Sequence, residues 1–277
     1  MLRTRILTAV VLAPAGIAMI FLAPAWVFKL VVVLFMLTGT WEFRRLAGLQ
    51  MAPGLTLLAL QTFIMALMFL YWPLVTGHAF TILLAGCFGW CLMFLRLARY
   101  RADQAPDLSF QAAGFLSALA GITTCTFSLA LLRDQAHGEF LILLLLIIIW
   151  AADIGAYFSG RYFGRTKLAP VISPKKTWEG VVGGIALAGI AALLLTHYTP
   201  GVGAGAGPAV ILVAVTVLTS VGGDLFISIH KRTVKIKDCG NIFPGHGGVL
   251  DRFDSLLAGA PFFALGIWIF GLLKVRM

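Results

Sequence analysis

The chain has 277 residues, of which 60% are hydrophobic and only 12% are charged, and its mean hydropathy is +0.98. Soluble globular domains are usually about one quarter charged, so this composition excludes a soluble domain and predicts a protein that crosses a membrane several times. The formal charge of +10 favours cytoplasmic loops and membrane lipids with anionic headgroups as partners, and no basic soluble domain is present to bind nucleic acid.

Apolar runs of nearly bilayer length recur along the chain and predict an all-α, polytopic integral membrane protein with about nine transmembrane helices. We place these helices near residues 6–23, 26–43, 55–76, 79–97, 110–132, 139–159, 179–197, 208–228 and 256–273. The first run follows Arg3 and Arg5 and imitates a secretory signal peptide. The apolar segments after it favour a first membrane helix that is not cleaved.

The distribution of positive charge predicts the orientation of these helices. With the N-terminus in the cytoplasm, 17 of the 21 lysines and arginines lie on the cytoplasmic side, the exceptions being Lys29, Arg133, Lys274 and Arg276. An odd number of helices leaves the last two on the outer side. Either their side chains reach back to the interface or one segment is not a full span.

The whole chain, residues 1–277, is interpreted as a single membrane domain with two unlike halves. Residues 1–135 are apolar helices with basic edges, which predict a scaffold. Within it, Glu42 stands beside Arg44 and Arg45, and we expect an interfacial ion pair there rather than a buried functional acid. Residues 136–277 form the predicted catalytic half, with two charged cytoplasmic loops at 160–178 and 229–255.

An acid, Asp153, follows an almost pure Leu/Ile run within the predicted helix 139–159. A carboxylate at membrane depth is costly unless it faces protein, water or an ion. Asp153 is therefore either a hydrogen-bonded packing acid or a contact to a ligand or ion. The small residues Gly180, Gly183, Gly184, Ala188 and Gly189 in the next predicted helix have the spacing of tightly packed membrane helices.

The loop 160–178 ends in the sequence Ser-Pro-Lys-Lys-Thr from Ser173 to Thr177, just before a helix that we expect to begin near Trp178. Hydroxyls, ammonium groups and free N–H groups at a helix start can bind an anion, so Ser173, Lys175, Lys176 and Thr177 are candidate phosphate contacts. The alternative is simple membrane anchoring by the lysine pair. The segment lacks the Gly-Lys-Ser/Thr ending of a P-loop, which disfavours a P-loop ATPase.

The densest polar chemistry lies between Ser220 and Ser255. At steps of four, four and three residues, Ser220, Asp224, Ser228 and Lys231 share one face of a helix. The residues that follow are rich in glycine and proline, so we expect a turn-rich loop whose backbone and lysines can approach an anion. This loop carries Lys237, His246 and Gly247, and we expect His246 to contact phosphate or organise the loop rather than act as a base.

Asp251, Arg252 and Asp254 close this loop at the start of the next apolar run. Mg²⁺ usually binds one or two carboxylates together with phosphate oxygens, so Asp224, Asp251 and Asp254 are the candidate ligands of a magnesium ion. The alternative is that the two later acids cap a helix N-terminus while the basic loop touches anionic lipid.

From Ser228 to Asp254 the chain resembles the signature of the phosphatidate cytidylyltransferases, the CDP-diacylglycerol synthases. The shared pattern is Ser, two residues, Lys-Arg, four residues, Lys-Asp, a Gly/Pro turn, His-Gly-Gly, two residues, Asp-Arg, one residue and Asp. His230 departs from it, because that position is usually apolar. The runs AADIGAYFSGRYFG and SPKKTWEG also resemble this family, and the resemblance extends from Trp150 to the C-terminus.

The resemblance implies that CTP and phosphatidic acid react to CDP-diacylglycerol and pyrophosphate in the cell inner membrane, with the active site facing the cytoplasm. The residues expected to act in catalysis are Asp224, Asp251, Lys231, Lys237 and Arg252. Those expected to bind substrate are Asp153, Ser173, Lys175, Lys176, Thr177, Ser228, Arg232, His246 and Gly247. Besides Mg²⁺ we allow for a second, monovalent cation, and a homodimer is compatible with the sequence.

Two other functions fit parts of the sequence. Another membrane phosphotransferase, such as a CTP-dependent polyprenol kinase or a polyprenyl-phosphate sugar-phosphate transferase, would also place cations and acids at the lipid boundary. A transporter or channel would use buried acids to coordinate ions. A transport pathway should distribute charges across the bilayer, whereas the charges here gather at one face.

Overall fold

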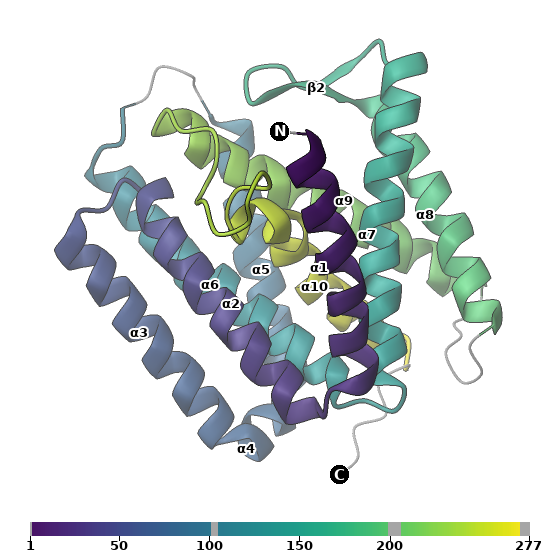
Figure 1. Ribbon diagram of the computed structural model, residues 1–277, viewed down its shortest axis with the longest axis horizontal. Coiled ribbons are helices and arrows are strands. Elements are labelled where there is room, and N and C mark those ends of the chain that lie inside the picture. Colours follow the sequence, from purple (N-terminus) through teal and green to yellow (C-terminus); the bar gives the residue numbers. More distant parts are fainter. Residues whose placement is uncertain (1, 101–104, 199–205, 272–277) are drawn as a thin grey trace.

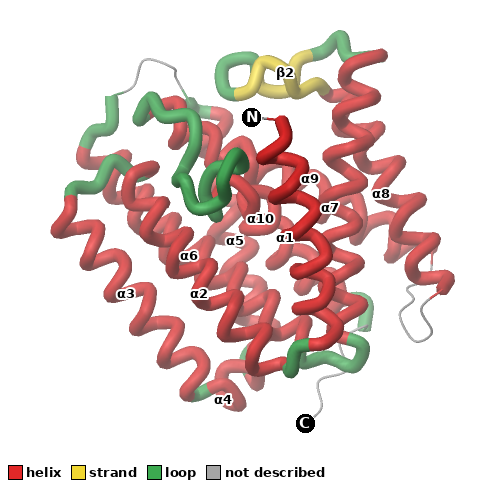
Figure 2. Tube along the Cα trace, viewed as in Figure 1, coloured by secondary structure: helices red, strands yellow, loops and turns green. Residues whose placement is uncertain are grey.

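The computed structural model describes residues 2–100, 105–198 and 206–271 and is built almost entirely of helices (Figures 1 and 2). The helices are α1 (Leu2–Leu22), α2 (Ala25–Leu46), α3 (Met51–Leu70), α4 (Trp72–Gly77), α5 (Ala79–Ala98), α6 (Leu108–Arg133), α7 (Gly138–Tyr162), α8 (Trp178–Tyr198), α9 (Ala206–Thr233) and α10 (Leu250–Ile269). The strands β1 (Lys167–Ala169) and β2 (Ser173–Thr177) form an antiparallel hairpin. The predicted all-α class is confirmed.

Eight of the described helices are long and apolar enough to cross a membrane, namely α2, α3 and α5 to α10. Ala13–Leu22, within α1, is a shorter apolar helix. The predicted run 55–76 is divided, because α3 ends at Leu70 and α4 begins at Trp72 with Pro73 in its first turn. Proline lacks the N–H that would continue the hydrogen-bond ladder. The protein is therefore a multi-pass membrane protein, as its composition predicts.

Small residues set the distance between α7 and α8. A Cβ on Gly155 would lie 2.6 Å from the carbonyl oxygen of Gly183, and a Cβ on Gly184 would lie 2.8 Å from that of Ala152. No larger residue fits these positions, so the two backbones touch, as the spacing of small residues predicts. Gly189 differs from the prediction, because it faces open space.

Helices α9 and α10 cross closely at Gly223. A Cβ on Gly223 would lie 2.6 Å from the carbonyl oxygen of Asp254 and 3.1 Å from the Cβ of Ala258. Helix α9 continues to Thr233, five residues beyond its expected end at 228, and α10 begins at Leu250 rather than near 256. The crossing therefore places the two ends that carry polar residues side by side.

The two ends of the bundle carry different groups. The hairpin, the loop between α9 and α10 and the start of α1 lie at one end, while α4 lies at the other (Figures 1 and 2). Near α4, Asp134 pairs with Lys29 at 2.5 Å and accepts a hydrogen bond from the indole of Trp72 at 2.7 Å. Lys29 and Arg133 thus lie away from the charged loops, in agreement with the charge pattern. Lys274 and Arg276 fall outside the described residues.

The contact between α7 and α8 predicts how leucine substitutions will behave. Gly183→Leu should lower stability by about 1–3 kcal/mol, the usual cost of overpacking a core, because the side chain must displace α7. Gly189→Leu should leave stability unchanged, because that position is open. Thermal unfolding of the purified variants in detergent measures both. Equal melting temperatures would contradict the assigned contact.

Candidate functional site

The β-hairpin is held against the end of α9, which brings the two predicted charged loops together. Ile172, at the turn of the hairpin, is buried with Leu225 and Ile229 of α9. The Nε of Arg232 donates a hydrogen bond to the carbonyl oxygen of Ile172 at 3.4 Å. Apolar packing thus fixes the hairpin, and a predicted substrate-binding residue, Arg232, is used for this attachment.

Lys176 forms an ion pair with Asp224, and this contact joins the hairpin to α9. Asp224 also accepts a hydrogen bond from the hydroxyl of Ser228 at 3.3 Å. Asp153 of α7 is close enough to interact electrostatically with both Lys176 and Asp224. Three elements that are distant in sequence therefore supply charged groups to one place.

Asp254 of α10 belongs to the same group of charges. Its carboxylate accepts a hydrogen bond from the backbone N–H of Ser255 at 2.7 Å. The carboxylate of Asp224 repels that of Asp254, and Lys231 and Lys176 partly offset this repulsion. We call Asp153, Lys176, Asp224, Lys231 and Asp254 the carboxylate–lysine cluster.

Asp251 has a different environment from the other two predicted magnesium ligands. One of its oxygens accepts a hydrogen bond from Lys231 at 2.9 Å, and the other accepts the backbone N–H groups of Cys239 at 2.8 Å and Gly248 at 2.9 Å. Within the described residues, no three His, Cys, Asp or Glu side chains are grouped closely enough to hold a metal ion. The three predicted carboxylates are thus divided, with Asp224 beside Asp254 and Asp251 bound to the loop.

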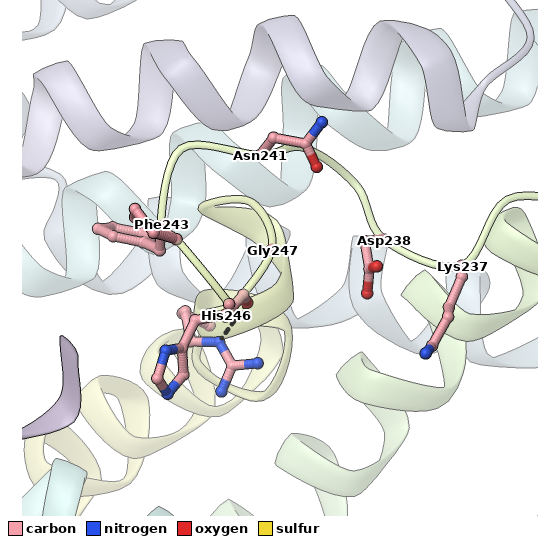
Figure 3. Close-up of a pocket in the computed structure, with 9 residues that line it drawn as sticks. Lys237, Asp238, Asn241, Phe243, His246 and Gly247 are labelled. Carbon is pink, nitrogen blue, oxygen red and sulfur yellow. Dashed lines mark hydrogen bonds between the residues drawn. The ribbon is translucent and has the colours of Figure 1, made fainter. Parts of the chain in front are cut away.

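The loop between α9 and α10, together with Arg252, lines an open polar pocket of about 600 Å³, which we call the loop pocket (Figure 3). Its lining includes Lys237, His246, Gly247 and Arg252, four of the predicted site residues. The Nε of Arg252 donates to the carbonyl oxygen of His246 at 3.1 Å. Figure 3 shows Lys237 and Asp238 together on the side of the pocket opposite His246, so a cationic and an acidic side chain both line this space.

The conformation of the backbone explains why a glycine occupies position 247 of this loop. Phe243 and Gly247 form an isolated antiparallel bridge, and the N–H of His246 donates to the carbonyl oxygen of Phe243 at 2.9 Å. Gly247 has a φ of +82°, a left-handed conformation that favours glycine. His246 helps to close this turn through its backbone, while the Nδ1 of its ring has no hydrogen-bond partner among the described residues.

Thr177 differs from its predicted place among the phosphate contacts. Its side chain is buried, and its hydroxyl accepts a hydrogen bond from the N–H of Gly180 at 3.1 Å. The hydroxyl therefore satisfies a free amide in the first turn of α8, as a helix cap does. The neighbouring Ser173 is partly exposed and Lys175 is exposed, so both are accessible to a ligand.

The environment of Glu42 differs from the interfacial ion pair that the sequence predicts. Its side chain is buried, and its two carboxylate oxygens accept the N–H groups of Val249 at 3.0 Å and Leu250 at 2.9 Å. Nothing near Glu42 in the sequence indicates these partners, which lie more than 200 positions away. His230, the departure from the family pattern, is buried among Phe43, Phe110 and Phe226 and thus belongs to the core.

The sequence profile described as the Cytidylyltransferase family matches residues 3–270. The chain belongs to this family. The match shows that the resemblance extends well beyond Trp150 into the N-terminal half. A phosphatidate cytidylyltransferase of Haemophilus influenzae is 35% identical, with 95% of this chain and 98% of that protein aligned. One of Pseudomonas aeruginosa is 36% identical, with 98% of each chain aligned. One of Rickettsia bellii is 43% identical over 51% of this chain and 64% of that protein.

The bonds of Asp251 predict the reactivity of the loop cysteine. Burial raises the pKa of the Cys239 thiol, so at pH 7–8 the group stays protonated and unreactive in the closed loop. Asp251→Asn removes the ion pair with Lys231 and weakens the bonds to the loop backbone. We expect a water-soluble maleimide to alkylate Cys239 about tenfold faster or more in this variant.

The experiment uses protein in which Cys87, Cys91 and Cys125 are replaced by alanine, so that only Cys239 can react. Asp254→Asn is the matched control, because Asp254 makes no bond to the loop among its described contacts. If Asp251→Asn left the alkylation rate unchanged, Asp251 would not hold the loop.

Proposed function

We propose that this protein is an enzyme that transfers the cytidylyl group of CTP to phosphatidic acid, giving CDP-diacylglycerol and pyrophosphate. Its family and its near full-length relatives support this reaction. The structural observation that carries the proposal is the ion pair between Lys176 and Asp224, which joins two charged segments beside Asp254. This ion pair brings charged groups that can bind phosphates to one end of the helical bundle, where a soluble nucleotide and a lipid headgroup can meet.

The main barrier to this reaction is the repulsion between two anionic substrates. The phosphate monoester of phosphatidic acid is already largely ionised near neutral pH, so it needs little help from a general base. Lys176 and Lys231 can offset charge on the reacting phosphates, and they are held nearby by Asp224 and Asp251. The proposal therefore requires positioned cations and no nucleophilic side chain.

The residues of the cluster fit a magnesium ion. Asp224 and Asp254 offer hard oxygen ligands, and their mutual repulsion is of the kind that a divalent cation relieves. When bound, Mg²⁺ would draw charge from the phosphate oxygens. We assign its binding to these two acids. Asp251, whose oxygens already accept three hydrogen bonds, is assigned to holding Lys231 and the loop. The second, monovalent cation stays a prediction.

We assign the loop pocket to the phosphate chain of the nucleotide. Lys237 and Arg252 carry positive charge, and the turn around Gly247 exposes a backbone without a side chain. Ser173 and Lys175 of the hairpin are accessible for further contacts. Asp153 belongs to the cluster, and Ser228 donates a hydrogen bond to Asp224 within it, so we assign both residues to positioning the charges there.

We further propose that the protein resides in the bacterial inner membrane with this end of the bundle facing the cytoplasm. Both charged segments and the start of α1 lie at that end (Figure 1). The excess of lysine and arginine in these segments favours the cytoplasmic side. CTP is available there. The homodimer stays a prediction.

The reaction predicts which phosphate of CTP enters lipid. Purified protein with phosphatidic acid, Mg²⁺ and CTP labelled at the α-phosphate should produce labelled lipid and unlabelled pyrophosphate. CTP labelled at the γ-phosphate should leave the lipid unlabelled and label the pyrophosphate. Label from the γ-phosphate in lipid would instead indicate a kinase, and ion flux in proteoliposomes without turnover of CTP would indicate a transporter.

Two neighbouring lysines provide matched variants for the same assay. Lys176→Met removes the ion-pair partner of Asp224 and should lower the rate about a hundredfold, the usual effect of losing one group that stabilises developing charge. Lys175→Met changes an exposed side chain and should cost much less. Equal losses in both variants would show that the ion pair with Asp224 has no special role.

A further inference from the structure

The N-terminal half contributes one side chain directly to the segment that carries the site. Glu42 lies in α2, and only 4% of its surface is exposed. One carboxylate oxygen accepts the N–H of Val249 at 3.0 Å, and the other accepts that of Leu250 at 2.9 Å. These N–H groups belong to the start of α10, so a helix more than 200 residues earlier in the chain fixes where α10 begins.

Helix α10 depends on this contact because its own N-cap residue, Val249, makes no side-chain cap bond. The first N–H groups of a helix have no partner inside the helix, and a carboxylate there also interacts favourably with the helix dipole. Glu42 supplies both effects from another helix. The first turns of α10 carry Asp251, Arg252 and Asp254. The contact between Glu42 and the start of α10 therefore also fixes the positions of these residues.

Two glycines of the loop accommodate the Glu42 carboxylate. A Cβ on Gly240 or on Gly248 would collide with the carboxylate group. Gly248 also donates its N–H to Asp251 at 2.9 Å. The loop therefore closes around Glu42 on one side and around Asp251 on the other, and neither glycine can be enlarged without moving an acid.

The charges that act on Glu42 come from two elements. Arg45 lies on its own helix and attracts it, while Asp251 of α10 repels it. The two backbone N–H groups are thus its only direct hydrogen-bond donors among the described contacts. An amide in place of the carboxylate could accept only one of these bonds and would turn its NH₂ group toward the other N–H.

We propose that Glu42 is a positioning residue for the reaction: by binding the first N–H groups of α10 it holds Asp254 and Arg252 where the phosphates of the substrates meet. This inference rests on the proposed function, to which it adds a role for the half of the chain that looked like a plain scaffold. Glu42 itself does not touch the substrates.

Glu42→Gln keeps the size of the side chain and tests the proposal. We expect kcat to fall about tenfold or more, because a charge-assisted hydrogen bond to a buried N–H is lost, and the Mg²⁺ concentration for half-maximal activity to rise. Hydrogen–deuterium exchange should increase in residues 239–255 and stay unchanged elsewhere. The exchange measurement needs neither substrate nor metal, so it reads the contact independently of activity.

Glu139→Gln is the matched control, since Glu139 pairs with Arg133 near the opposite end of the bundle, and it should change none of these values. Gly248→Ala probes the same contact without changing Glu42. It should reproduce the loss of kcat and the faster exchange, and the double variant should be no worse than the more severe single variant.

The outcomes separate the two proposals. Failure of the wild-type protein to make CDP-diacylglycerol would overturn the proposed function. A wild-type protein that is active, with Glu42→Gln unchanged in kcat, Mg²⁺ dependence and exchange, would overturn the positioning role alone. If Glu42→Gln does not fold, wild-type kcat and exchange in Gly248→Ala would overturn it equally.

Discussion

The close crossing of α9 and α10 at Gly223 is the constraint on which the site depends. Because no side chain separates the helices there, Asp224 lies near enough to Asp254 for the two partly buried carboxylates to repel each other. Two like charges held in this way are unfavourable on their own. Lys176 of the hairpin and Lys231 near the end of α9 offset part of that cost. The arrangement therefore favours the binding of cations and phosphates, and it does not stabilise the fold.

The rest of the fold keeps these charges in place. Small residues bring α7 against α8 and so locate Asp153 and the hairpin. The apolar contact of Ile172 with α9 seats the hairpin without using Lys176. Bonding of buried charges contributes little net stability, since desolvation offsets most of the attraction. Apolar packing therefore supplies the stability, and the charged groups remain available for chemistry.

Much of this could be predicted from the sequence because it depends on local spacing. The polar face of α9, the helix starting at Trp178 and the turn-rich loop before α10 follow from helical periodicity and from the properties of glycine. The division of the three acids could not be predicted, because it depends on which backbone N–H groups the loop directs at Asp251. The hydrogen bond between Thr177 and Gly180 could not be predicted either, because a hydroxyl at a helix start can cap the helix as readily as it can bind phosphate.

Glu42 shows the limit of local reasoning most clearly. Next to two arginines in sequence, it was expected at the interface, yet its partners are backbone groups in another part of the chain. Backbone N–H groups leave no trace in the sequence. The only local hint was the pair of glycines, Gly240 and Gly248. A side chain at either position would collide with the Glu42 carboxylate, but this reason cannot be seen before the carboxylate is located.

The most direct test of the account is the binding of Mn²⁺, a spectroscopic substitute for Mg²⁺, to the purified protein in the presence of CTP, followed by electron paramagnetic resonance. If the crossing at Gly223 builds the cation site, Asp224→Asn and Asp254→Asn should each weaken binding about tenfold or more, while Glu139→Gln binds as the wild type does. Wild-type affinity for Mn²⁺ in both aspartate variants would contradict the account.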